Sequence, residues 1–415
     1  MKERTLKPDT SKLKRRAFLA GSGTSIVSFG IVKPQSVFAA AANEKVKLGL
    51  IGAGGRGTWI SRLFMKHGGY TLAAVSDYFE DRVNRYGDLF DVPAANRFTG
   101  MSSYKRLLDK GIVDAVAIES PPYFHPEQAA AGVEAGVHVY TAKPIAVDVP
   151  GCLLMEASGK KASKNNLCYL IDFQTRANEF FIEAIKRVRN GAIGEFAFGQ
   201  SSYHAGNPWS RQVQYMKDDP KNIENRLRAW GLDRILSGDI ITEQNIHTLD
   251  VASWIMNRPP VQASGSYGYK VRNDGGNCRD SFMVVFQYPD NVGISFSSRQ
   301  FEGHGTSGGI KNRMYGSQGV LETEYGGGVL IRGENAYKGS NTKNIFTEGV
   351  ENNISTFHNN IMNNDCENPT VAPSVRSNLV TILGRTAAYT DEIVRWDDML
   401  ERKEKLEMDF TGLKD

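Results

Sequence analysis

The sequence is poor in the residues that usually mark metal centres and disulfide frameworks. Only four of its 415 residues are cysteine and seven are histidine. Cys152, Cys168, Cys278 and Cys366 form no C-x-x-C pair and no metal-type spacing, so the pattern predicts no metal site. A core of this size needs no covalent staple, which favours four buried free thiols, but pairing of two of them stays open.

Unbalanced charge and long apolar runs are also scarce. The formal net charge is +4, but residues 1–40 carry eight Lys/Arg and two Asp/Glu, and the rest carries 42 basic and 44 acidic residues. This balance gives no electrostatic case for a nucleic-acid partner. No later segment is long and apolar enough to span a bilayer, whereas 40% hydrophobic residues suffice to fill the core of two domains or one large one.

Residues 1–42 have the features of a targeting segment. Lys14-Arg15-Arg16-Ala17-Phe18-Leu19-Ala20 contains a twin arginine, an uncharged run extends to Val32, and small residues at 39–42 offer a cleavage site. The pattern is similar to a Tat signal peptide. It predicts export of the folded protein to the periplasm by the Tat machinery.

A glycine-rich turn follows the first strand pattern. A strand is predicted over 46–51 and a helix over 58–67, and the glycines between them have the G-x-G-x-x-G spacing. Such a turn lets backbone approach a pyrophosphate, and the helix N-terminus offers free N–H groups. The predicted cofactor contacts here are Gly52, Gly54, Gly55, Arg56 and Gly57.

A carboxylate ends the next strand pattern. The apolar run 71–76 leads to Asp77, twenty residues after Gly57. At that spacing a carboxylate accepts hydrogen bonds from the adenosine ribose and repels a 2′-phosphate. Asp77 therefore predicts NAD rather than NADP.

Strand and helix patterns alternate through residue 165. Helices are predicted near 80–90, 103–110, 125–135 and 152–164, and strands over 114–119 and 136–140. This order predicts an α/β fold whose first domain, residues 43–165, is a Rossmann domain with a doubly wound parallel sheet. Ligands of such sheets gather at the carboxyl ends of the strands. The candidate contacts there are Ser120, Pro121, His125 and Lys143.

Residues 166–415 have longer, alternating strands. After a strand over 167–173, strands are predicted over 195–204, 261–271, 280–288, 292–301, 310–315, 319–325 and 328–332. One helix is predicted over 243–256, and a closing helix over 374–394 is expected to pack back on the first domain. The pattern predicts a C-terminal α+β domain with an open, mostly antiparallel sheet.

Together these stretches resemble the Gfo/Idh/MocA family of dinucleotide-dependent oxidoreductases. The resemblance rests on residues 52–57, 114–125, 136–144, Ser237-Gly238-Asp239 and 243–250. With the twin-arginine leader, the chain resembles the exported branch to which glucose–fructose oxidoreductase belongs. The resemblance implies a sugar, polyol or related carbohydrate substrate, and an open sheet used for contacts in a homodimer or homotetramer.

Two motifs depart from the family pattern. The family's Glu-Lys-Pro is Ala142-Lys143-Pro144 here, and its Asp-x-x-x-His is Glu243-x-x-x-His247. A neutral imidazole accepts a hydroxyl proton near neutral pH, so His247 is the expected base. Lys143 is expected to stabilise charge on the reacting oxygen. Glu243, His247 and Asp250 have the spacing of one helix face, with Glu243 expected to orient a substrate hydroxyl and Asp250 the helix or the imidazole.

Other polar and aromatic residues are candidate substrate contacts, although a structural role is also open for each. They are Gln174, Arg176, Tyr203, Trp209, Asp239 and Asp280. Aromatic faces suit stacking on a sugar ring, and the polar groups suit hydroxyls.

These features predict an exported, NAD(P)-dependent oxidoreductase that acts on a sugar, polyol or glycoside hydroxyl. Free nicotinamide nucleotide is not expected outside the cytoplasm, so the cofactor is expected to be loaded before export and to stay bound. One alternative is a glycoside hydrolase or lyase that oxidises and re-reduces its substrate in one cycle. The other alternative is a non-catalytic sugar-binding protein that keeps the nucleotide. Ala142, in place of the family's acidic residue, favours this alternative.

Overall fold

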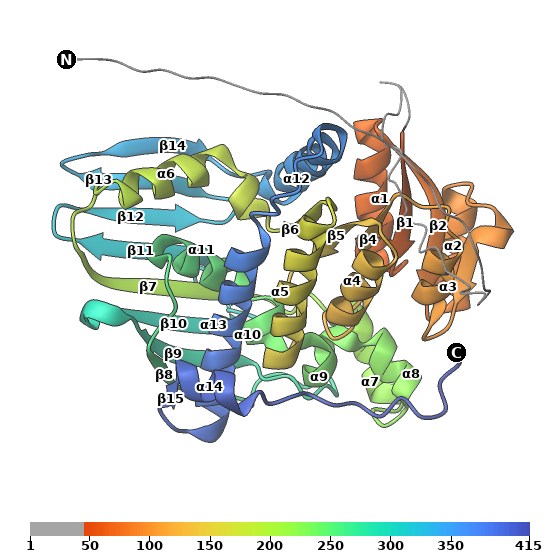
Figure 1. Ribbon diagram of the computed structural model, residues 1–415. Coiled ribbons are helices and arrows are strands. Elements are labelled where there is room, and N and C mark those ends of the chain that lie inside the picture. Colours follow the sequence, from red (N-terminus) through yellow and green to blue (C-terminus); the bar gives the residue numbers. More distant parts are fainter. Residues whose placement is uncertain (1–44) are drawn as a thin grey trace, which may run out of the picture. The chain divides into compact units, whose positions relative to one another are not determined.

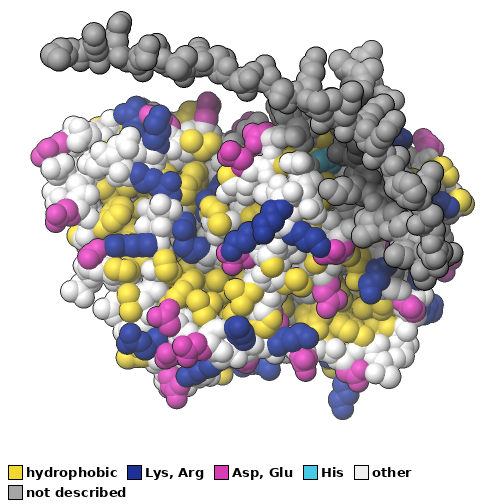
Figure 2. All heavy atoms as spheres, in the orientation of Figure 1, with side chains coloured by type: hydrophobic (Ala, Val, Ile, Leu, Met, Phe, Trp, Pro, Cys, Tyr) yellow, Lys and Arg dark blue, Asp and Glu magenta, His cyan; other side chains and the backbone are white. Residues whose placement is uncertain are grey.

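The computed structural model describes residues 45–415 (Figure 1). The predicted signal peptide, residues 1–42, lies outside this range. No helix among the described residues is long and apolar enough to cross a membrane. On the face shown in Figure 2, basic and acidic side chains are interspersed, and apolar side chains lie between them.

The first sheet has six parallel strands in the order β3-β2-β1-β4-β5-β6. Its strands are β1 (Val46–Ile51), β2 (Tyr70–Asp77), β3 (Arg97–Thr99), β4 (Ala115–Ile118), β5 (His138–Ala142) and β6 (Tyr169–Asp172). The neighbouring strands β4 and β5 are buried along their whole length, as expected for short apolar runs covered on both faces. This is the predicted doubly wound sheet, and β3 is a strand that the pattern missed.

Helices connect these strands close to the predicted positions. They are α1 (Gly55–His67), α2 (Glu80–Leu89), α3 (Ser103–Asp109), α4 (His125–Glu134) and α5 (Val149–Lys164). Helix α1 begins three residues earlier than predicted, inside the glycine turn. That shift brings Arg56 onto the first turn of the helix.

The second sheet has nine strands in the order β14-β13-β12-β11-β7-β10-β9-β8-β15, and only β7 and β10 pair in parallel. Its strands are β7 (Phe196–Ala205), β8 (Gln262–Gly268), β9 (Ser281–Gln287), β10 (Gly293–Gln300), β11 (Gly309–Gly316), β12 (Gly319–Glu324), β13 (Gly328–Gly333), β14 (Tyr337–Asn341) and β15 (Val394–Arg395). The predicted mostly antiparallel sheet is confirmed, with β14 and β15 added. Burial alternates along β9, so one face of the sheet is covered and the other is open.

Helices lie on the covered face of the second sheet (Figure 1). They are α6 (Glu179–Arg189), α11 (Ile246–Met256) and α13 (Val371–Thr390), while α12 (Ile345–Asn363) packs against α1. The shorter helices are α7 (Val213–Asp218), α8 (Ile223–Arg228), α9 (Arg234–Ser237), α10 (Asp239–Glu243) and α14 (Trp396–Arg402).

The first sheet extends past the predicted domain boundary at residue 165, because β6 is its edge strand. Helix α13 contacts both α5 and the second sheet. Its Asn378 accepts a hydrogen bond from Ile145 N–H and donates one to the Ala146 carbonyl. The closing helix thus touches the first domain, as expected, although the exact boundary between the domains stays a prediction.

The predicted single helix over 243–256 is wrong. Helix α10 ends at Glu243, and α11 begins at Ile246. At the break, Asn245 N–H bonds to the carbonyl of Ile240, five residues back, instead of four. Glu243 and His247 therefore do not share one helix face.

Candidate active site

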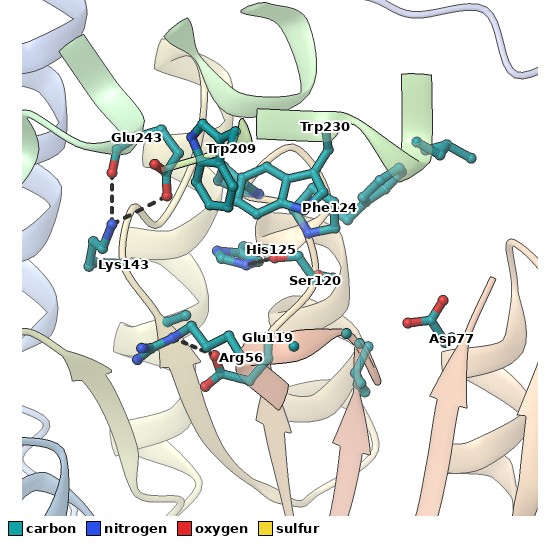
Figure 3. Close-up of a pocket in the computed structure, with 18 of the residues that line it drawn as sticks. Arg56, Asp77, Glu119, Ser120, Phe124, His125, Lys143, Trp209, Trp230 and Glu243 are labelled. Carbon is teal, nitrogen blue, oxygen red and sulfur yellow. Dashed lines mark hydrogen bonds and ion pairs between the residues drawn. The ribbon is translucent and has the colours of Figure 1, made fainter. Parts of the chain in front are cut away.

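A cavity of about 720 Å³ opens at the carboxyl ends of the parallel strands and is closed by segments of the C-terminal region. Its lining includes the predicted contacts Gly52, Gly54, Gly55, Arg56, Asp77, Ser120, Pro121, His125, Lys143, Gln174, Tyr203, Trp209, Glu243 and His247. In Figure 3, Lys143 and Glu243 lie on the opposite side of the cavity from Asp77. The cavity thus connects the predicted ribose contact with the predicted catalytic groups.

The glycine turn has the shape that a dinucleotide needs. Gly52 has φ +99°, and a Cβ there would lie 2.5 Å from Ser120 N, while a Cβ on Gly57 would lie 2.0 Å from Gly52 O. A Cβ on Gly54 would meet no atom closer than 3.9 Å. Gly52 and Gly57 are required by the turn and its packing, whereas Gly54 faces open cavity at the helix N-terminus, where a pyrophosphate would fit.

Asp77 is held in the cavity wall by backbone. Its Oδ2 accepts from Ala53 N–H at 2.8 Å, and its Oδ1 accepts from Phe79 N–H at 2.9 Å. Burial raises the pKa of Asp77, although these hydrogen bonds and Arg82 act against the rise. The carboxylate is thereby oriented at the end of β2, where ribose hydroxyls are expected.

Lys143 is the buried cation beside Glu243. Its Nζ donates to the Glu243 carbonyl at 2.7 Å and to Oε1 at 3.3 Å (Figure 3). Burial lowers the pKa of Lys143, and the charge of Glu243 acts in the opposite direction. The Lys143–Pro144 peptide bond is cis. Glu243 thus orients the ammonium group, although it sits on a different helix from His247.

His247 lines the same cavity at the start of α11. Burial lowers the pKa of its imidazole well below the usual value, and the positive charges of Lys143 and Arg56 add to this effect. The imidazole is therefore neutral at physiological pH. A neutral imidazole can accept a proton from a substrate hydroxyl.

Sequence reasoning missed an ion-pair cluster beneath these groups. Arg56 pairs with Glu119, which follows β4, at 2.8 Å (Figure 3). It also pairs with Asp172, the last residue of β6. Burial raises the pKa of Glu119 to about 7, against the attraction of Arg56. Register pairs Ile118 with Thr141, so Glu119 lies opposite Ala142. The Glu119 carboxylate thus lies at the end of the strand next to that of Ala142, the position at which the family motif has its glutamate.

Two further polar groups join the site from the C-terminal region. The Tyr325 hydroxyl is buried and has no hydrogen-bond partner within residues 45–415, and its ring centroid lies 5.2 Å from that of His247. Tyr203 donates to Gln244 Oε1 at 2.5 Å. Tyr325 follows β12, and no local sequence signal links it to His247.

Aromatic side chains form one wall. The ring centroids of Trp209 and Trp230 lie 4.7 Å apart, and Figure 3 shows both rings above His125. Trp209 was predicted here from sequence, whereas Trp230 was not. Flat apolar faces beside polar groups suit a sugar ring.

His125 and Ser120 belong to the cavity wall. His125 contacts the carbonyls of Pro144 at 2.8 Å and Ser120 at 2.7 Å. Burial lowers the pKa of His125 to about 4, so the ring is neutral and its single N–H donates to only one of the two carbonyls. The ring lies between the turn after β4 and the turn after β5, which makes His125 a residue that shapes the site.

Three predicted substrate contacts lie outside the cavity. Arg176 pairs with Asp250 at 2.8 Å, so Asp250 does not orient the imidazole. The oxygens of Asp239 accept from the backbone N–H groups of Ile240 and Arg279. Asp280 accepts from two backbone N–H groups, at 2.6 and 2.7 Å. All of these carboxylates are satisfied within the protein, which explains their burial without a ligand.

Curated relatives match about half of the chain. A glycosyl hydrolase family 109 protein of Shewanella sp. (strain ANA-3) is 24% identical over 212 residues, which cover 50% of this chain and 42% of that protein. An alpha-N-acetylgalactosaminidase of Shewanella oneidensis is 27% identical over 213 residues, with the same coverage. The chain therefore spans less than half the length of these relatives.

Solved structures match more of the chain. Aldose-aldose oxidoreductase from Caulobacter crescentus has a TM-score of 0.64 at 20% identity, over 85% of this chain and 100% of that one. Levoglucosan dehydrogenase in complex with NADH and levoglucosan has a TM-score of 0.65 at 16% identity, over 85% of this chain and 99% of that one. Myo-inositol 2-dehydrogenase from Lactobacillus plantarum has a TM-score of 0.65 at 20% identity, also over 85% of this chain and 99% of that one. At these identities the likeness shows the fold.

Two family models match consecutive parts of the chain. Residues 46–169 match the model described as "Oxidoreductase family, NAD-binding Rossmann fold". Residues 181–322 match the model described as "GFO/IDH/MocA C-terminal domain". The chain therefore belongs to the Gfo/Idh/MocA family of oxidoreductases, with an NAD-binding Rossmann domain.

Proposed function

We propose that the protein is an NAD-dependent oxidoreductase that acts on a hydroxyl group of a sugar, polyol or glycoside. The observation that carries the proposal is the meeting of Lys143, Glu243 and neutral His247 in the cavity that contains the glycine turn. The rings of Trp209 and Trp230, which line the same cavity, suit contact with a carbohydrate ring.

Each group has a distinct part in the proposed reaction. The glycine turn and Asp77 would hold NAD, which would supply the acceptor for the hydride of the carbon that is oxidised. His247 accepts the hydroxyl proton, and the ammonium group of Lys143 stabilises negative charge on the same oxygen. Glu243 holds Lys143 through its carbonyl and carboxylate. Asp77 binds the adenosine ribose, which favours NAD over NADP.

We also propose that the cofactor stays bound after export of the folded protein to the periplasm. Contacts across the adenosine end support retention. Arg228 of α8 pairs with Asp81 of α2 at 2.8 Å, and Tyr78 donates to Glu224 at 2.6 Å. In addition, Met101 N–H donates to Lys414 O at 2.9 Å, so the C-terminal segment also lies along this end. These contacts must open before a bound dinucleotide can leave.

The open face of the second sheet supports a homodimer or homotetramer. Met283 and Val285 of β9 are 60% and 51% exposed, and Phe198 of β7 stacks on Tyr315 of β11 at the surface. Apolar side chains gathered on one sheet face are typical of subunit contacts.

A second candidate is a glycoside hydrolase or lyase in which the hydride returns to the substrate. The names of the curated relatives favour it. Lys143 and His247 would then serve transient oxidation that acidifies the neighbouring carbon. Retention of the cofactor suits this cycle as well.

The test is an absorbance spectrum of the purified protein before and after a panel of sugars and glycosides, without added nucleotide. We expect a band of reduced nicotinamide to rise with one substrate, and Lys143→Met and His247→Asn to abolish the rise while cofactor content persists. Release of free aglycone without a lasting band would establish the glycosidase instead. Sugar binding without either change would establish a non-catalytic binding protein.

A further inference from the structure

Two cysteines that lie 198 positions apart in the chain meet in the structure. Cys168 Sγ lies 2.9 Å from Cys366 Sγ, and both side chains are buried. Optimal contacts between non-bonded carbon atoms are about 3.5–4.0 Å, and sulfur is a larger atom, whereas a disulfide bond is about 2.05 Å long. The two sulfur atoms are thus closer than unbonded thiols prefer, and a covalent bond requires a movement of less than about 1 Å.

The surroundings give this contact a structural purpose. Cys168 directly precedes β6, the edge strand of the Rossmann sheet, and Cys366 lies in the connection 364–370 between α12 and α13. Side chains of that connection satisfy the free edge of β6. Tyr169 N–H donates to Asn368 Oδ1 at 2.6 Å, and Ile171 N–H donates to Thr370 Oγ1 at 3.1 Å. The connection thus replaces a seventh strand.

We propose that Cys168 and Cys366 form a disulfide bond that fixes the 364–370 connection to strand β6. The bond would hold the start of β6 in place, and this short strand ends at Asp172, the partner of Arg56, and leads to Gln174 in the cavity. This inference is independent of the proposed reaction.

The alternative for these cysteines is a metal site. His138 joins them in a group whose ligand atoms all lie within 4.8 Å of one another. However, a tetrahedral zinc ion with Zn–S bonds of about 2.3 Å holds its two sulfur ligands about 3.8 Å apart. The observed 2.9 Å is too short for that geometry. His138 Nδ1 also already accepts from Cys168 N–H at 2.9 Å.

The oxidation requires a partner, which we assign to the class of thiol–disulfide exchange proteins. The two cysteines lose two protons and two electrons as the Sγ–Sγ bond forms, and the partner's disulfide is reduced to two thiols. Burial raises the pKa of both thiols in the folded protein, which keeps the reactive thiolate scarce. The bond is therefore expected to form during folding, before the connection closes over β6.

Peptide mapping tests the bond directly. The full chain is produced in an oxidising compartment, or refolded with glutathione and glutathione disulfide, and then unfolded, alkylated and digested with trypsin without reductant. We expect peptide 165–176 to be linked to peptide 344–376, and only Cys152 and Cys278 to be alkylated. Reductant should release two more thiols, so that all four cysteines are alkylated.

Variants separate this pair from the other cysteines. Cys366→Ser should abolish the linked peptide, whereas Cys278→Ser, which removes another buried thiol, should keep it. Reductant should lower the melting temperature of the wild type and of Cys278→Ser by about 5 °C and leave that of Cys366→Ser unchanged. Four alkylated cysteines in the oxidised wild type would overturn the proposal, and so would one tightly bound zinc ion per chain. The wild-type map decides the question even if a variant fails to fold.

Discussion

Arg56 Nε lies 2.8 Å from Glu119 Oε2, which joins the first turn of α1 to the end of β4. The guanidinium also pairs with Asp172 on β6. Neither oxygen of Glu119 meets hydrogen-bond geometry with a partner among residues 45–415. Because burial outweighs the attraction of Arg56, the pKa of Glu119 rises from 4.5 to about 7.

This raised pKa predicts how Glu119 affects stability. The folded state binds the Glu119 proton more tightly than the unfolded state does, so this group stabilises the fold below about pH 4.5. That contribution is lost as the pH rises to about 7. Glu119→Gln does not titrate, so its free energy of unfolding relative to wild type should increase over this window, by roughly 3 kcal/mol at most. Urea unfolding from pH 4.5 to 8 measures the difference.

The exposed Glu127→Gln on α4 is the matched control and should follow the wild type at every pH. If the free energies of unfolding of Glu119→Gln and wild type differed by a constant amount across this range, burial would not raise the pKa of Glu119.

The glycines of the turn should separate folding from cofactor binding. A Cβ on Gly57 would meet Gly52 O at 2.0 Å, so Gly57→Ala should lower the melting temperature of the nucleotide-free protein and also weaken NAD binding. A Cβ on Gly54 has no atom closer than 3.9 Å. Gly54→Ala should therefore keep the melting temperature and reduce NAD affinity at least tenfold, because the methyl group enters the space of the pyrophosphate. Calorimetric titration checks this, and undiminished affinity in Gly54→Ala would place the pyrophosphate elsewhere.

The fold was predictable because its signals are local. The G-x-G-x-x-G spacing, the short buried strands and the alternating later strands each lie within a few residues of one another. The break between α10 and α11 was not predictable, because residues 243–256 carry no proline or glycine to mark it.

The site was predictable only in part, for a related reason. Lys143 and His247 lie in short motifs, whereas the partners of Arg56 are 63 and 116 positions away and no spacing rule relates them. Asp239 and Asp280 lie outside the cavity lining and bind backbone N–H groups, a structural role that a polar residue near a motif can equally have.

Removal of the Glu243 charge should alter the pH dependence of turnover. Glu243 raises the pKa of Lys143 against the effect of burial, so Glu243→Gln should lower that pKa. The alkaline limb of the kcat/KM profile should then move to lower pH, since neutral Lys143 stabilises negative charge less well. Glu322→Gln, which removes a remote acid paired with Arg313, should leave the limb in place. A uniform loss of kcat/KM without a shift would mean that Glu243 acts on the substrate and not through Lys143.

The open sheet face should determine the oligomeric state. Val285→Glu places a charge among the exposed apolar side chains of β9 and should shift the mass measured by light scattering toward the monomer. The control is Leu89→Glu at the end of α2. Leu89 is 47% exposed in the wild type, and its substitution should leave the mass unchanged. An equal mass for wild type and Val285→Glu would place the subunit contact on another surface.

Arg228 should govern how fast bound cofactor exchanges. Its guanidinium pairs with Asp81 and lies 3.9 Å from the centroid of the Phe79 ring, so it joins α8 to the adenosine end of the cavity. A partly exposed ion pair and a cation–π contact together contribute about 1–2 kcal/mol, so Arg228→Ala should speed release of bound NAD about tenfold. Labelled NAD added to the holoenzyme measures the exchange, with Arg313→Ala on the second sheet as the control. Because exposed ion pairs are screened, added salt should speed exchange in the wild type more than in Arg228→Ala. If the two proteins exchange at the same rate at low salt, the contacts of Arg228 do not retain the cofactor, and the proposed retention rests on the Tyr78–Glu224 bond and on the C-terminal segment beside Met101.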